Sequence, residues 1–136
     1  MSKSQGKTLS NSLPLSCFVY GTGQDDGVCL LLQIGKYRIL LDCGLKDLQL
    51  LLEQDLPPVD FIFCSHAHAD HCRGLLELHQ AFPQVPVNTS EVTAKLLPCH
   101  WLEEEIDRNL DWCSATAWRS PIIIAENLQL ELVPAG

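Results

Sequence analysis

Three histidines and one aspartate lie within six consecutive positions of this chain, at His66, His68, Asp70 and His71. Neutral imidazole nitrogens and carboxylate oxygens are the ligands that zinc and related divalent ions prefer. The chain has 5 histidines in 136 residues, so a chance gathering of three of them at this spacing is rare. The pattern therefore predicts a metal-binding loop.

The spacing of these four side chains favours two adjacent ions over one closed tetrahedral site. Side chains two positions apart in an extended segment point to the same side, so His66 and His68 can converge on one ion. Asp70 and His71 stand where the chain bends toward a helix, and they can turn toward a second ion. Paired ions of this kind lie about 3.5–4 Å apart and clamp both ends of a displacement reaction.

The residues around the loop predict the elements that must position it. An apolar strand over 59–64 precedes the histidine run, and an apolar helix beginning near Cys72 follows it. Asp42 ends another apolar strand, at 37–41. Its carboxylate is either a turn residue or helix cap, or a group that orients a ligand histidine through that histidine's other ring nitrogen.

The rest of the chain predicts a mixed α/β (α+β) sheet with helices on its outer face. Glycine and proline breakers separate the elements, and Gly35-Lys36 predicts a hairpin turn. Residues 1–13 are expected to form a flexible lead-in. Strands are expected at 17–20, 28–34 and 85–87, with two more over 121–133 separated by Glu126-Asn127; helices are expected at 46–54 and 90–97, and 99–118 has a helical tendency.

Composition excludes several classes of protein. Hydrophobic residues make up 46% and charged residues 19%, which suits one small folded domain. The formal net charge of −8 argues against a free-standing nucleic-acid surface, but not against a cleft whose metal ions supply positive charge. The 7 cysteines show no Cys-x-x-Cys pair, which favours a reducing cytoplasm. No signal-length or membrane-length apolar run occurs, so no membrane association is expected.

Residues outside the loop carry weaker functional signals. His79 and His100 stand alone, and a surface role is favoured for each. Cys72 follows His71 directly, but zinc sites of the open type use histidine and carboxylate. Gly21-Thr22-Gly23 lacks the third glycine and the following helix of a dinucleotide-binding fingerprint. A loop packed near the metal site is the better interpretation of that segment.

The run His66-x-His68-x-Asp70-His71, preceded by an aspartate-ended apolar strand, resembles the metallo-β-lactamase superfamily. The segments Gly21–Gly27 and Ile39–Gly44 are similar to the opening of its β-CASP branch, which includes RNA-processing nucleases. The resemblance implies an αββα sandwich of which this chain is the N-terminal half. It also implies two zinc ions, with His66 and His68 on the first, Asp70 and His71 on the second, and Asp42 supporting the site from behind.

In that family another histidine, usually after an Ala-Gly pair, helps to complete the site, whereas this sequence stops at Leu132-Val133-Pro134-Ala135-Gly136. Residues 14–136 are therefore expected to be a partial domain that stops before the third metal-binding motif. The resemblance implies a zinc-dependent phosphodiesterase or ribonuclease acting on RNA, with Asp70 orienting the attacking nucleophile. With two ligands for each metal, residues 1–136 alone should bind metal weakly and turn over little substrate.

Two alternatives remain open at this stage. In the first alternative, the chain is a non-catalytic scaffold, or its fold is completed by self-association or by a missing C-terminal half that covers an uncovered sheet. Otherwise it is part of a small-molecule hydrolase of the same superfamily, acting on a thioester or lactam.

Overall fold

The computed structural model describes residues 14–22, 27–53 and 58–133. The expected lead-in at 1–13 and the terminal residues 134–136 lie outside these ranges. The elements follow one another as β1 (Leu15–Thr22), β2 (Val28–Ile34), β3 (Tyr37–Leu41), α1 (Gln49–Leu52), β4 (Phe61–Cys64), α2 (Ala69–Cys72), α3 (Leu75–Ala81), β5 (Val87–Ser90), α4 (Glu91–Leu96), the 3₁₀ helix η3 (Leu97–Trp101), β6 (Cys113–Thr116), β7 (Ile122–Ala125) and β8 (Leu128–Leu130).

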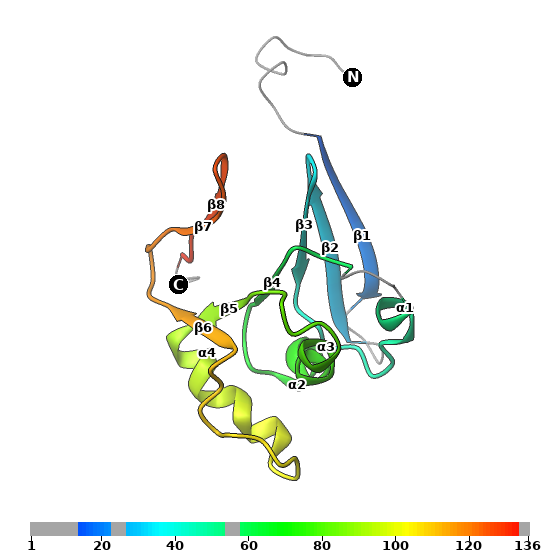
Figure 1. The fold of residues 1–136 in the computed structure, drawn as a ribbon, viewed down its shortest axis with the longest axis vertical. Helices are drawn as coiled ribbons and strands as arrows, with labels where there is room; N and C mark the ends of the chain where they lie inside the picture. Colours follow the sequence, from blue (N-terminus) through cyan, green and yellow to red (C-terminus); the bar gives the residue numbers. More distant parts are fainter. Residues whose placement is uncertain (1–13, 23–26, 54–57, 134–136) are drawn as a thin grey trace.

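Six strands form one mixed sheet in the order β1-β2-β3-β4-β5-β6 (Figure 1). The first three strands are antiparallel neighbours, and Gly35 takes a positive φ of 59° in the turn between β2 and β3. From β3 onward every neighbouring pair is parallel. This arrangement confirms the mixed α/β sheet that the sequence predicts, and it matches part of a metallo-β-lactamase fold.

One face of the sheet carries the hydrophobic core. Leu40, Ile62 and Val87 lie on that face in three neighbouring strands, and each is almost completely buried. The helices supply the other half of the core, through Leu51 of α1, Leu75 and Leu78 of α3, and Leu97 and Trp101 of η3. The core is therefore built between one sheet face and the helices.

The opposite face of the sheet is only partly covered. In register across β1 to β4 lie Val19, Leu30, Leu41 and Phe63. Val19 is 50% exposed, and the other three side chains are half-buried. An apolar surface of this kind is a typical contact area for further polypeptide.

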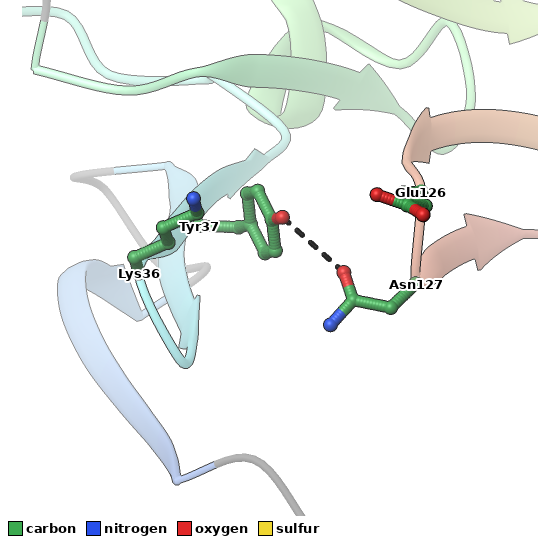
Figure 2. A pocket seen from close by; sticks show the side chains of 4 residues that line it. All are labelled: Lys36, Tyr37, Glu126 and Asn127. Carbon is green, nitrogen blue, oxygen red and sulfur yellow. Dashed lines mark hydrogen bonds between the residues drawn. The ribbon is translucent and has the colours of Figure 1, made fainter.

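The β7–β8 hairpin is a separate two-stranded sheet and is drawn in orange to red in Figure 1. The phenol of Tyr37, at the start of β3, donates a hydrogen bond of 3.2 Å to the Oδ1 of Asn127 in its turn. Figure 2 shows Lys36 and Tyr37 on one side of an open cavity of about 720 Å³, with Glu126 and Asn127 on the other. This cavity lies at the opposite end of β3 from Asp42.

Several predicted elements are confirmed and others need correction. The strands at 28–34 and 37–41 match β2 and β3 to the residue, and Glu126-Asn127 forms the β7–β8 turn. The helical tendency of 99–118 is wrong over 113–116, which forms β6. The apolar helix expected to begin near Cys72 is α3, which begins at Leu75, and a separate short helix, α2, precedes it and carries Asp70 and His71. The helix expected at 46–54 is limited, among described residues, to Gln49–Leu52.

Strand pairing explains why residues 113–116 form β6 and not a helix. Residues 113–116 have weak intrinsic preference for a strand, but they pair in parallel with β5 along its whole length.

Within the part of the chain that the structure describes, the helices are too short or too polar to span a membrane.

Candidate metal centre

The candidate site lies at the carboxyl ends of the parallel strands, the edge at which open α/β sheets bind ligands. Asp42 directly follows β3, and Ser65 directly follows β4. The Asp42 N–H donates a hydrogen bond of 2.8 Å to the carbonyl of Phe63, which continues the pairing of the two strands to the edge of the site. The sheet therefore places Asp42 and Ser65 side by side.

The histidine loop is the segment 65–68 between β4 and α2. His68 has extended backbone (φ −75°, ψ 144°) and precedes the first turn of α2, where its carbonyl accepts from the N–H groups of His71 and Cys72 at 2.9 and 3.1 Å. The ring centroids of His66 and His68 are 4.7 Å apart, and those of His66 and His71 are 3.9 Å apart. The fold thus gathers all three imidazoles of the run.

Asp42, at the end of β3, forms hydrogen bonds with Ser65 after β4 and with His71 in α2. Its Oδ1 accepts from the Ser65 N–H at 2.6 Å, and its Oδ2 accepts from the Ser65 hydroxyl at 2.8 Å. The same Oδ2 lies 2.7 Å from the Nδ1 of His71. Asp42 is 5% exposed and has a φ of 66°, a left-handed conformation that aspartate adopts more readily than most residues. It takes this conformation where the chain leaves the sheet.

These contacts fix which ring nitrogen carries the proton. The Ser65 hydroxyl has one proton, which it donates to Asp42, so toward His66 Nδ1 at 2.9 Å it accepts. Asp42 likewise accepts from Nδ1 of His71. Both imidazoles therefore carry hydrogen on Nδ1 when neutral, and each has the lone pair of Nε2 free for a ligand. This is the arrangement in which metal-binding histidines are held by a carboxylate or a neighbouring group.

Asp70 lies in the first turn of α2 with its side chain 44% exposed. One carboxylate oxygen is 3.8 Å from the Nε2 of His71, on the side of the ring away from Asp42. Asp70 and His71 therefore present one oxygen and one nitrogen to a common space, as the sequence predicts. Their role as metal ligands stays a prediction.

Three glycines allow the backbone segments around the site to touch. A Cβ on Gly44 would lie 1.7 Å from the carbonyl oxygen of Asp70, and one on Gly27 would lie 2.0 Å from the carbonyl of Gly44. A Cβ on Gly21 would in turn lie 2.2 Å from the carbonyl of Gly27. No side chain fits at these contacts. The described ends of the glycine-rich segment therefore pack toward the site, as expected, whereas residues 23–26 lie outside the described ranges.

Burial shifts the pKa values of His66 in the loop and of Cys72 in α2. Burial, together with the nearby imidazoles of His71 and His68, lowers the pKa of His66, which keeps its ring neutral at pH 7. Burial raises the pKa of the Cys72 thiol to about 12, and Cys72 faces the core with no exposed surface. Cys72 therefore stays a protonated thiol, in keeping with a site built from histidine and carboxylate.

The donor set fits part of a zinc site. Across the described ranges, no three histidine, cysteine, aspartate or glutamate side chains converge closely enough to form a metal-binding group. The nitrogen and oxygen donors are nevertheless of the type that zinc takes, and the Nδ1 contacts of His66 and His71 match those of ligand histidines. His66 with His68, and Asp70 with His71, supply two donors each, one fewer than the three protein ligands of a catalytic zinc.

Two further residues belong to the site, and sequence reasoning missed them. Ser65 links Asp42 to His66, and its position directly before the histidine run was the available signal. His100 bonds through Nε2 to the carbonyl of Ala67 although its side chain is exposed, and nothing in the sequence pointed to that contact. His79, expected at the surface, is half-buried and stacks on Trp112 with ring centroids 4.3 Å apart.

Comparison with known proteins adds independent information. The family model of the metallo-beta-lactamase superfamily matches residues 22–133. The uncharacterized protein sll0514 of Synechocystis is 49% identical over 133 residues, covering 97% of this chain and 23% of that protein. A "Probable RNase MJ4" of Methanocaldococcus jannaschii is 38% identical over 73 residues, covering 51% of this chain and 17% of that protein. The chain thus spans about a quarter or less of the length of these relatives.

Proposed function

We propose that this chain, which belongs to the metallo-beta-lactamase superfamily of hydrolases, is part of a two-zinc enzyme that cleaves RNA. The observation that carries the proposal is the gathering of His66, His68 and His71 at the carboxyl edge of the sheet, with Asp42 bonded to the Nδ1 of His71. The activity belongs to the whole protein, of which this chain supplies one part of the site.

The choice of RNA over other substrates is supported by two similarities. Half of the chain matches a protein named as a probable RNase. The segments Gly21–Gly27 and Ile39–Gly44 resemble the opening of the β-CASP branch, and three glycines in them make the close backbone contacts that lead to Asp70. We therefore assign the protein to that branch as part of the proposal.

Each residue of the loop has a distinct task in the proposed reaction. His66 and His68 would hold one zinc ion, and Asp70 and His71 the other. When bound, zinc supplies a Lewis acid that lowers the pKa of a coordinated water to about 7. Asp42 accepts a hydrogen bond from the Nδ1–H of His71 and so keeps that ring's Nε2 lone pair available for the metal.

The Ser65 hydroxyl accepts a hydrogen bond from the Nδ1–H of His66 and so keeps the Nε2 of His66 available for the metal. Asp70, half-exposed beside His71, orients the nucleophile as a hydrogen-bond acceptor. A pocket of about 350 Å³ opens beside His66 and His68, with Val92 and Leu96 of α4 forming its apolar wall. Substrate can therefore approach the loop from the side of α4.

Metal titration of this chain tests the site. Calorimetry with Zn²⁺ should show weak binding that disappears in the double variant His66→Ala/His68→Ala, because those rings are the proposed ligands of one ion. His79→Ala is the matched control, since His79 is a histidine outside the loop and stacks on Trp112. Binding that survives in the double variant, or that is lost equally in the control, would refute the proposed ligands.

The substrate is tested with the whole protein that contains this chain. A labelled single-stranded RNA should be cut in a zinc-dependent reaction, whereas a thioester and a β-lactam should not be. Hydrolysis of either small substrate without RNA cleavage would favour the alternative of a small-molecule hydrolase of the same superfamily. A zinc-loaded protein that cuts none of the three would contradict the proposal.

A scaffold or a partner-completed chain is the second candidate, because Val19, Leu30, Leu41 and Phe63 leave an apolar face of the sheet partly uncovered. We expect further polypeptide of the same protein to cover that face. Sedimentation of this chain alone distinguishes the cases: self-association points to an uncovered contact surface, whereas a stable monomer argues against one.

A further inference from the structure

The carbonyl of Ala67, between the two proposed ligands His66 and His68, is held by a residue far along the chain. His100 lies in η3, and its Nε2 bonds to that carbonyl. We propose that His100 is a positioning residue, which fixes the histidine loop so that the rings of His66 and His68 stay together. This inference rests on the proposed function, because it concerns the same metal centre.

The carbonyls on either side of Ala67 are bonded locally. The carbonyl of His66 accepts from the thiol of Cys64 at 3.3 Å, two residues away. The carbonyl of His68 accepts from the N–H groups of His71 and Cys72 as α2 begins. Only the bond to Ala67, within the described residues, ties the segment between the two ligand histidines to an element outside β4 and α2. His100 is therefore the external anchor of Ala67, whereas Asp42 holds Ser65 at the start of the loop.

The helix that carries His100 is packed into the core although the His100 side chain is exposed. Leu97 and Pro98 at the start of η3 are buried, and Trp101, which follows His100, is 7% exposed. Trp101 also packs near Trp112, with ring centroids 6.2 Å apart. Because Leu97, Pro98 and Trp101 fix η3 in the core, the imidazole of His100 can hold Ala67 at a constant distance from the core.

His68 depends on this anchor more than its neighbours do. His66 and His71 have their Nδ1 atoms bonded to Ser65 and Asp42, which fixes both rings directly. The ring of His68 has no such hydrogen bond among the described residues, and it contacts the His66 ring edge-on. Its place is set by the backbone on either side, and His100 holds one of those sides.

The test compares His100→Ala with His100→Gln in this chain, since a glutamine amide can still donate to the Ala67 carbonyl. We expect His100→Ala to weaken Zn²⁺ affinity by about 10–100-fold, the usual effect of removing a group that orients a ligand. His100→Gln should recover most of that loss. Leu102→Ala is the matched control, because Leu102 is 66% exposed on the same segment. It should bind Zn²⁺ as the unchanged chain does.

A second measurement needs no metal. Nitrogen-15 relaxation of the metal-free chain should show the backbone order parameters of residues 66–68 falling from about 0.85 toward 0.6 in His100→Ala. In His100→Gln they should stay high. Unfolding midpoints of all variants should remain close together, since the His100 side chain is exposed.

Specific outcomes overturn the inference. It fails if the loop of His100→Ala stays as ordered as that of the unchanged chain, or if the glutamine variant behaves like the alanine variant. It also fails if Zn²⁺ affinity falls only in step with unfolding stability. A chain whose loop loosens as expected, but whose Zn²⁺ binding does not depend on His66, supports the anchor and refutes the proposed metal site.

Discussion

The two ends of the paired strands β3 and β4 differ in how they use an aspartate. At the carboxyl end, Asp42 is buried and receives the Ser65 N–H, the Ser65 hydroxyl and the Nδ1 of His71. At the amino end, Asp60 has a side chain 43% exposed. It accepts from the Arg38 N–H at 2.8 Å and pairs with the Arg38 guanidinium at 3.5 Å.

The larger of the two cavities lies at the amino end of β3, away from the histidine loop. The space of about 720 Å³ between the two hairpin turns is bridged by one hydrogen bond, between Tyr37 and Asn127 (Figure 2). The smaller pocket of about 350 Å³ lies beside His66 and His68. A buried carboxylate bonded to three donors is costly to build, so Asp42 supports placing the proposed metal centre at the carboxyl end better than cavity size does.

The largest effect is expected for Gly44→Ala. The added Cβ would lie 1.7 Å from the carbonyl oxygen of Asp70, a backbone atom that cannot rotate away. The start of α2 must therefore shift, and the free energy of unfolding should fall by at least about 3 kcal/mol, the upper range for overpacking. Urea unfolding followed by circular dichroism measures the change.

Gly35→Ala is the comparison at the other end of the strand pair. Gly35 has a φ of 59° in the β2–β3 turn, so alanine there is strained by about 1–2 kcal/mol. Zn²⁺ binding should be unaffected by that variant and lost in Gly44→Ala. Equal losses of stability and of Zn²⁺ binding in the two variants would break the distinction between the ends.

The next largest effect is expected for Asp42→Asn. Asparagine keeps the left-handed backbone conformation, but it offers one acceptor oxygen and an amide N–H₂ to three donors. The free energy of unfolding should fall by about 2 kcal/mol, because a buried donor without a partner costs about 1–3 kcal/mol. Zn²⁺ affinity should fall by about 10–100-fold.

The matched control is Asp60→Asn at the amino end. Exposed ion pairs contribute about 0–1 kcal/mol, so stability should change by less than that, and Zn²⁺ affinity should not change. If Asp60→Asn destabilised the chain as much as Asp42→Asn, the hydrogen bonds to the buried Asp42 would contribute no more to stability than the exposed ion pair does.

The sequence predicted the local part of this architecture. The apolar runs at 28–34 and 37–41, separated by Gly35-Lys36, predicted β2 and β3 to the residue. Ser90 was expected to cap a helix, and its hydroxyl accepts from the Thr93 N–H at 3.2 Å. These features depend on neighbours within a few positions, where propensity and turn chemistry are informative.

Features that depend on distant residues could not be predicted in the same way. Residues 113–116 become β6 because β5 offers a partner edge, a tertiary effect that outweighs their weak preference. The run of four candidate ligands was evident from spacing alone, but the contact of His100 with Ala67 joins residues 33 positions apart. Asp42 could be suspected of supporting a histidine, yet only the fold shows that the histidine is His71.

The smallest effect is expected for Tyr37→Phe, at the amino end of β3. The change removes the exposed hydrogen bond from the phenol to Asn127 and leaves the ring in place. The free energy of unfolding should fall by less than about 0.5 kcal/mol, because water can replace the lost partner at the surface. Zn²⁺ affinity should be unchanged, since Tyr37 lies about 17 Å from Asp42 along a strand rising about 3.3 Å per residue. Urea unfolding and calorimetry on the same preparation measure both quantities. A loss above 1 kcal/mol, or any weakening of Zn²⁺ binding, would mean that the β7–β8 hairpin supports the metal centre from the far end of the sheet.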